Sequence, residues 1–120
     1  MLNDAVCFKA VYIVTGYTDL RSGIDKLALL IEDRLGSSPY LPDTLYLFCG
    51  RRTDRIKGLV WEKDGWLLLY KRLQDGNFQW PRSEAEVRKL TQQQFRWLME
   101  GLTTNPKKAV RPSPPPEYTA

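Results

Sequence analysis

The fold is decided by residues 44–81, which read TLYLFCGRRTDRIKGLVWEKDGWLLLYKRLQDGNFQWP. They predict a meander of antiparallel strands, because two Asp-Gly pairs separate runs that are rich in aromatic and aliphatic residues. A two-residue Asp-Gly connection is a strong hairpin signal, since these residues tolerate the positive φ angles of a type I′ turn. We therefore expect turns at 64–65 and 75–76, the second leading into a strand at 78–80.

A turn at Asp64-Gly65 also predicts the register of the first hairpin. The expected pairs are Leu59 with Tyr70, Trp61 with Leu68, and Lys57 with Arg72. Like charges directly opposite each other cost about 0.2–1 kcal/mol, and an anion lying between them removes that cost. The register gathers six cations at one end of the sheet: two lie in the loop before the strand, and Lys71 lies on the opposite face from Arg55, Lys57 and Arg72. We call them the basic sheet end: Arg51, Arg52, Arg55, Lys57, Lys71 and Arg72.

Before the meander, the chain predicts a strand at 8–14 and a helix at 22–35. Ser22 and Asp25 resemble a capping box, apolar residues recur at helical spacing, and Gly36 is suited to end the helix in a left-handed conformation. Residues 44–49 are apolar throughout, which is typical of a strand covered on both faces.

Beyond the meander, we expect C-terminal helices at 84–102. Ser83 to Glu86 resembles a capping box that starts a short helix to about Leu90, and Thr91 with Gln94 begins a second. The fold class is thus α+β, with an antiparallel sheet of about four to five strands (meander at 44–80) packed by these helices. We expect one domain over 1–104. The basic, proline-rich tail at 105–120 is expected to be disordered.

Composition sets broad bounds. The 120 residues are 42% hydrophobic and 27% charged, which is typical of a soluble globular protein. No apolar run reaches the roughly 20 residues of a membrane span, and the first residues lack the features of a secretion signal, so a cytoplasmic protein is expected. Cys7 and Cys49 are interpreted as buried, reduced thiols. The absence of histidine excludes a Cys–His nucleophile and a His-containing zinc site.

The positive charge is local. The net charge is +4; residues 1–50 carry four Lys/Arg against six Asp/Glu, residues 51–82 eight against four, and residues 83–120 six against four. Such clustering favours a surface that meets a polyanion over an evenly mixed, solvated surface. Aromatic residues on the same sheet face are candidates for stacking on unpaired bases, although most aromatics of a sheet this size belong to the core. These candidates are Trp61, Trp66 and Tyr70.

Catalytic chemistry has weaker support. A two-metal nuclease needs several converging carboxylates, and turns or caps already explain most of the acidic residues. Asp19 and Asp54 remain, but each lies beside an arginine, so a structural ion pair is the simpler interpretation. No glycine-rich phosphate-binding motif occurs. We therefore expect no catalytic residue, no metal and no cofactor.

Several blocks of the sequence together form a specific pattern. The blocks are Gly16-x-Thr18-Asp19-Leu20-Arg21-x-Gly23-Ile24-Asp25-x-Leu27, Arg51-Arg52-x-Asp54-Arg55-Ile56-Lys57, Trp61, Asp64-Gly65, Tyr70-Lys71-Arg72-Leu73 and Gly76-x-Phe78-x-Trp80-Pro81. In this order they resemble one family: the accessory proteins encoded by the second open reading frame of bacterial insertion sequences of the sixty-six family, often called transposition protein B. The resemblance covers roughly residues 11–102. Leu20 stands where the family has methionine, Gly58 where it has a larger aliphatic residue, and Glu62 where it has aspartate.

The resemblance implies a role in transposition beside a separate, larger transposase that performs strand transfer. Three hypotheses remain open. The first is a non-catalytic module that binds DNA, for instance the element ends, through the basic sheet end. The second is a protein-interaction module that bridges the transposase and another element-encoded accessory protein, and the third is a metal-dependent nuclease. The motif residues without an assigned role are Thr18, Asp19, Arg21 and Asp54.

Overall fold

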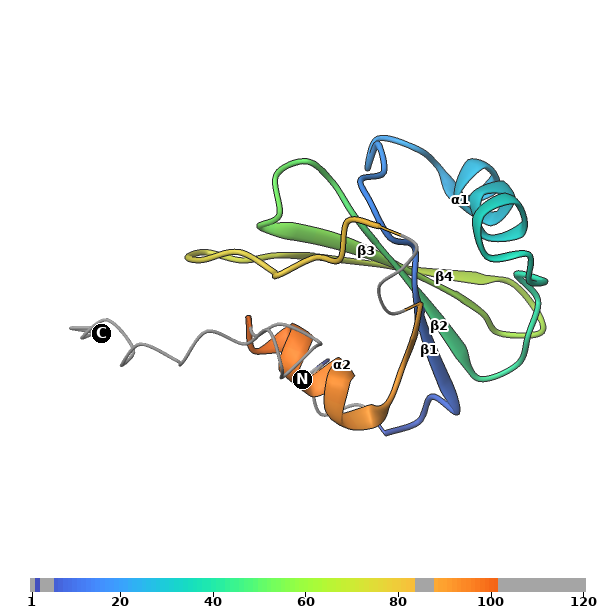
Figure 1. Cartoon of the computed structure of the whole chain (residues 1–120). Coiled ribbons are helices and arrows are strands. Elements are labelled where there is room, and N and C mark those ends of the chain that lie inside the picture. Colours follow the sequence, from blue (N-terminus) through green and yellow to red (C-terminus); the bar gives the residue numbers. More distant parts are fainter. Residues whose placement is uncertain (1, 3–5, 84–87, 102–120) are drawn as a thin grey trace.

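The computed structural model describes residue 2, residues 6–83 and residues 88–101. A five-stranded sheet lies at the centre, in the spatial order β4-β3-β2-β1-β5. Helix α1 covers one face of the sheet and helix α2 the other (Figure 1). The elements are β1 (Ala10–Ile13), α1 (Ile24–Leu30), the π-helix η2 (Ile31–Leu35), β2 (Thr44–Cys49), β3 (Arg55–Trp61), β4 (Trp66–Arg72), β5 (Lys89–Leu90) and α2 (Gln92–Met99).

The α+β class and the mostly antiparallel sheet are confirmed, with one parallel pair. Strand β1 runs parallel to β2, with Ala10 opposite Thr44, and helix α1 lies in the connection between them. This connection is long enough for a parallel crossover, which requires a dozen or more residues. Strand β2 has the predicted bounds and is buried along its whole length, because strands flank it on both sides and a helix covers each face.

The first helix begins later than the sequence predicts. Its N-cap is Gly23, and no side chain caps it. Ser22 lies in the preceding turn, where its backbone N–H donates to the carbonyl oxygen of Asp19 at 3.0 Å, so the expected capping box does not form. The π-helix η2 continues α1 and ends at Gly36, where the sequence predicts the end of the helical stretch; Gly36 has a φ of 61°.

The predicted register of the first hairpin is wrong by two residues. Trp61 pairs with Trp66, so that Leu59 faces Leu68, Lys57 faces Tyr70 and Arg55 faces Arg72. The turn is centred on Lys63 and Asp64 rather than on Asp64-Gly65, and Lys63 takes the positive φ, 72°. This register brings the two tryptophan rings to 5.0 Å and lets Tyr40 contact both, a cluster that a two-residue Asp-Gly turn would separate.

The chain after β4 also departs from the expectations. It reverses near Gly76, where φ is 84°, but residues 78–80 form no strand. Lys89–Leu90 forms strand β5 beside β1, where the sequence predicts a helix; residues 84–87 and 102, which belong to the predicted helices, and the predicted tail lie outside the described residues. Helix α2 has the predicted capping box of Thr91 and Gln94.

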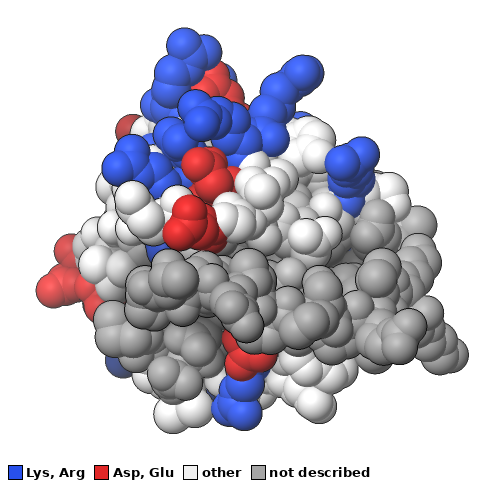
Figure 2. Space-filling model, turned by 90° about the vertical axis from the view of Figure 1, so that its left-hand side faces the viewer, with Lys and Arg blue, Asp and Glu red and all other residues white. Residues whose placement is uncertain are grey.

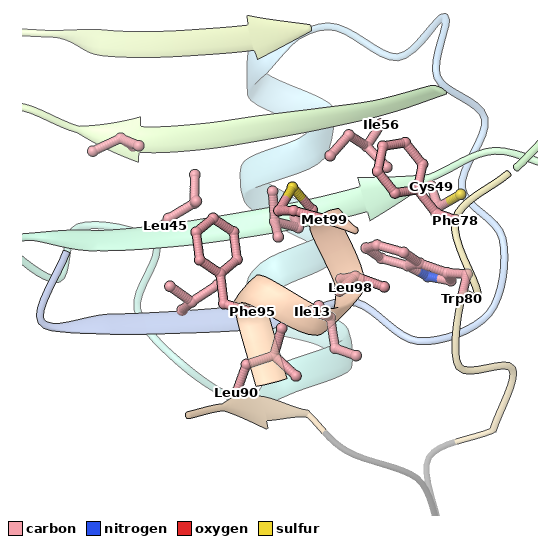
Figure 3. Close-up of a cluster of buried hydrophobic side chains, with 13 residues drawn as sticks. Ile13, Leu45, Cys49, Ile56, Phe78, Trp80, Leu90, Phe95, Leu98 and Met99 are labelled. Atoms are coloured by element: carbon pink, nitrogen blue, oxygen red, sulfur yellow. The ribbon is translucent and has the colours of Figure 1, made fainter. Parts of the chain in front are cut away.

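Two apolar clusters hold the helices to the sheet. Figure 3 shows the one beneath α2, where Phe95, Leu98 and Met99 point toward the sheet beside Trp80 and Phe78. The other lies beneath α1 and joins the helix residues Leu27 and Ile31 to the opposite side chains of β2 and β3. Cys49 is buried in the first cluster as expected, whereas Cys7 is exposed, contrary to the prediction.

Candidate nucleic-acid interface

The loop between β2 and β3, residues 50–54, is the centre of the candidate site. Backbone hydrogen bonds fix it to the segment that follows β4. Leu73 N–H donates to the Asp54 carbonyl at 2.6 Å, and Phe78 N–H donates to the Thr53 carbonyl at 2.7 Å. The loop is therefore held in place on its C-terminal side although Arg51 and Arg52 are exposed.

A second segment, residues 15–23, lies against the same end of the sheet. Thr18 N–H donates to the carbonyl of Cys49 at 2.8 Å, at the end of β2. A Cβ atom on Gly50 would lie 3.3 Å from the Leu20 side chain, so glycine allows this segment to pack closely on the loop. Two sequence blocks that are about thirty residues apart thus form one surface.

The basic sheet end has cations on both faces, as predicted. Arg55 and Lys57 alternate along β3 on the α1 face, and Arg72 lies opposite Arg55 on β4. Lys71 pairs with the core residue Ile56 and lies on the α2 face. Figure 2, which views the molecule from the left-hand side of Figure 1, shows Lys and Arg side chains gathered in one area at the top, interrupted by a few acidic ones.

Two of the arginines in this area are paired with carboxylates. The Arg55 guanidinium donates to Asp54 at 3.0 Å and 3.3 Å, and this hydrogen bonding lowers the pKa of Asp54. Arg21 donates to Asp19 from its side chain at 3.1 Å and 3.0 Å, which lowers the pKa of Asp19 to about 2. Both carboxylates are therefore charged at neutral pH and neutralise their partners.

Arg51, Arg52 and Lys57 are not neutralised in this way. Among the described residues, no carboxylate lies within ion-pair distance of any of the three. Lys57 Nζ donates only to a backbone carbonyl, that of Ser22, at 3.4 Å. These cations remain available to an anion from outside the chain.

The cations surround an open hollow of about 690 Å³, which we call the basic hollow. Its lining combines five basic side chains and one acidic side chain with aromatic and aliphatic surface: Tyr17, Thr18, Asp19, Leu20, Arg21, Gly50, Arg51, Arg52, Arg55, Lys57 and Tyr70. Arg51 and Arg52 also line a second, more polar hollow of about 410 Å³ beside residues 77–80. The two arginines thus stand between two recesses.

The three aromatic candidates lie in different surroundings. Tyr70 lines the basic hollow and is 54% exposed. Trp61 and Trp66 are half-buried at the other end of the hairpin, where they pack on Tyr40. The structure therefore places one of the three beside the cations.

Sequence reasoning missed the contribution of Tyr17, Leu20 and Gly50 to the hollow. Their block stands out only through the family resemblance, which says nothing about where the block lies in space. Thr18, from the same block, is 6% exposed, and its hydroxyl has no hydrogen-bond partner among the described residues.

Two other features are absent from the described residues. In the described part of the chain, no three His, Cys, Asp or Glu residues come together in a way that could hold a metal ion. No helix in that part is long and apolar enough to cross a membrane.

Comparison with known proteins gives four findings. A family model described as IS66 Orf2 like protein matches residues 9–109. The chain is 34% identical over 104 residues to the uncharacterized protein y4hO of Sinorhizobium fredii (strain NBRC 101917 / NGR234), a match that covers 86% of this chain and 90% of that protein. It is 28% identical over 92 residues to the uncharacterized protein y4jC of the same strain, covering 77% and 78%. No solved structure matches the chain.

Proposed function

The chain belongs to the family of IS66 Orf2-like proteins, and from this premise we propose that it is a non-catalytic accessory protein of insertion-sequence transposition that binds DNA through the basic sheet end. It acts in the cytoplasm beside the element-encoded transposase, which performs the strand transfer. Its contribution is to hold DNA near the element ends.

The observation that carries this proposal is a set of cations that lack an ion pair. Arg51, Arg52 and Lys57 line one hollow, and no carboxylate of the described residues lies within ion-pair distance of any of them. Arginine forms bidentate contacts with phosphate, and lysine provides a point charge. Phosphate contacts of this kind position a protein on DNA and account for most of its non-specific affinity.

The pairing of Arg55 with Arg72 supports the same proposal. Two guanidinium groups that start from directly opposite strand positions repel each other. Asp54 neutralises one of them, so the remaining excess charge lies with Arg72 and the loop arginines. A phosphate near these positions removes that excess.

Titration of DNA binding against salt tests the proposal. A 20-base-pair duplex with a fluorescent label is titrated with protein at several salt concentrations, and anisotropy is measured. Each phosphate contact contributes about −0.9 to the slope of log affinity against log salt, so five or six contacts give about −5. Changing Arg51 and Arg52 to alanine together makes the slope less steep by about 2 and weakens binding.

The matched control removes two cations elsewhere. Lys63 lies in the β3–β4 turn and Arg96 is exposed on α2, and their double replacement by alanine lowers the net charge from +4 to +2, as the test variant does. We expect the control variant to keep nearly the whole slope. If both variants bind with the slope of the unaltered protein, or if both lose it equally, DNA does not bind at the basic sheet end.

A further inference from the structure

The basic hollow contains more than charge. A surface that only tracks a phosphate backbone needs cations, whereas this hollow also contains Leu20 and Tyr70 between its cations. Leu20 is half-buried and lies against Gly50. The volume of the basic hollow, about 690 Å³, lies within the range of roughly 300–1,000 Å³ that is typical of small-molecule sites. Its lining is suited to a group that has both an apolar ring and an anionic part.

A nucleotide has these two parts. Its phosphate fits the cations that form no ion pair with a described carboxylate, Arg51, Arg52 and Lys57, and its base fits the exposed ring of Tyr70 and the side chain of Leu20. Bases stack on aromatic side chains whatever their sequence, because every base has a π face. In a duplex the base is held in the stack, so a protein pocket reaches it only when the base is unpaired.

We propose that the basic hollow takes one unpaired nucleotide of DNA, with the phosphate at the loop arginines and the base against Tyr70 and Leu20. This inference rests on the proposed function and narrows its ligand to DNA that has an unpaired or extruded base. Tyr17 is less suited to stacking, because the guanidinium of Arg82 already lies 5.9 Å from its ring centre.

The test compares three labelled 20-base-pair duplexes by anisotropy: one intact, one with a single bulged thymidine, and one with a bulged abasic residue. The last two have the same extra phosphate, and only one of them has a base. We expect the bulged thymidine to bind about fivefold or more tightly than the intact duplex, and the abasic bulge to lose most of that gain.

Substitutions of Tyr70 test whether its ring is responsible for the preference for the bulged base. Tyr70→Ala abolishes the preference for the bulged base, whereas Tyr70→Phe keeps it because stacking needs the ring and not the hydroxyl. The matched control is Tyr40→Ala, since Tyr40 is 53% exposed, close to the 54% of Tyr70. Tyr40 packs on Trp61, at the end of the β3–β4 hairpin that lies away from the basic hollow. This control keeps the preference.

The outcomes separate the two proposals. Equal binding of all three duplexes, with the expected salt slope, overturns the single-nucleotide site and leaves DNA binding intact. A bulged base and an abasic bulge that bind equally well also overturn it, because the protein then recognises the bend and not the base. If none of the three duplexes binds, the proposed function fails as well.

Discussion

At the scale of single residues, Thr18 is the least expected feature of the site. Its hydroxyl is buried without a hydrogen-bond partner among the described residues, and a buried, unsatisfied polar group costs about 1–3 kcal/mol. Thr44 is buried as well, but its hydroxyl donates to the Pro42 carbonyl at 2.9 Å. The same residue type is thus unsatisfied at one position and satisfied at the other.

We predict that Thr18→Val raises the free energy of unfolding by about 1 kcal/mol, because valine keeps the shape and removes the unpaired hydroxyl. Thr44→Val, the control, lowers it by a similar amount because a hydrogen bond is lost. Urea unfolding monitored by tryptophan fluorescence measures both. A Thr18→Val protein that is less stable than the parent would show that the hydroxyl has a partner in solution.

The two cysteines are predicted to differ in reactivity. Burial raises the pKa of the Cys49 thiol to about 12, whereas Cys7 is exposed. Only the thiolate reacts, so at pH 8 a thiol reagent modifies Cys7 in seconds to minutes and Cys49 only after unfolding. Counting reactive thiols with and without guanidinium checks this, and Cys7→Ser leaves a folded protein with no fast-reacting thiol.

The raised pKa of Cys49 also makes the stability of the folded protein depend on pH. The folded state prefers the protonated thiol, so its contribution is complete below the unfolded pKa near 9 and is lost as pH rises from there toward about 12. In Cys49→Ala, the free energy of unfolding lacks this decrease between pH 9 and about 12.

At the scale of elements, a glycine and a lysine in the left-handed region can be compared. Gly36 ends the first helix at a φ of 61° with no atom near the position of a Cβ, and Lys63 lies in the β3–β4 turn at 72°. Glycine takes such angles freely, whereas other residues pay roughly 1–2 kcal/mol.

We therefore predict opposite effects for two substitutions. Gly36→Ala destabilises the protein by about 1 kcal/mol through backbone conformation alone, and Lys63→Gly stabilises it by a few tenths to about 1 kcal/mol. Thermal unfolding of both variants measures the difference. A Lys63→Gly protein with a lowered melting temperature would place the turn at Asp64-Gly65 after all.

The elements also show what the sequence can and cannot predict. Strand β2, the left-handed Gly36 and the capping box at Thr91 depend on local signals, and all three were predicted. The hairpin register was not, because Asp-Gly marks a turn without fixing which two residues are central, and the contacts among Tyr40, Trp61 and Trp66 are tertiary. Strand β5 has two residues and depends on its pairing with β1, which no local pattern reveals.

At the scale of the whole molecule, the candidate site also combines features that local sequence predicts with features that depend on long-range contacts. The clustering of cations follows from strand alternation, so the sequence could predict it. The contribution of residues 17–20 depends on how the segment before α1 packs on the end of β2, and that is a long-range contact. The sequence therefore predicted the charge of the surface and not its shape.

Trp80 joins the segment after β4 to the centre of the sheet. Its indole N–H donates to the carbonyl of Val14 at 3.1 Å, and its ring is buried. We predict that Trp80→Phe lowers the free energy of unfolding by about 1–3 kcal/mol, because a buried carbonyl loses its donor. Trp97→Phe on α2 is the control, since the described residues include no partner for its indole N–H, and we expect a smaller loss in denaturant unfolding.

The hydrogen bonds that fix the loop before β3 to the segment after β4 have a consequence for synthesis on the ribosome. The backbone of the Arg51–Arg52 loop is fixed by residues 73 and 78, and Gly16 is fixed by the carbonyl of Pro81. A nascent polypeptide that has emerged only as far as residue 70 thus has every loop cation but none of these contacts. The basic hollow therefore takes shape late in translation, once the chain emerges past residue 81.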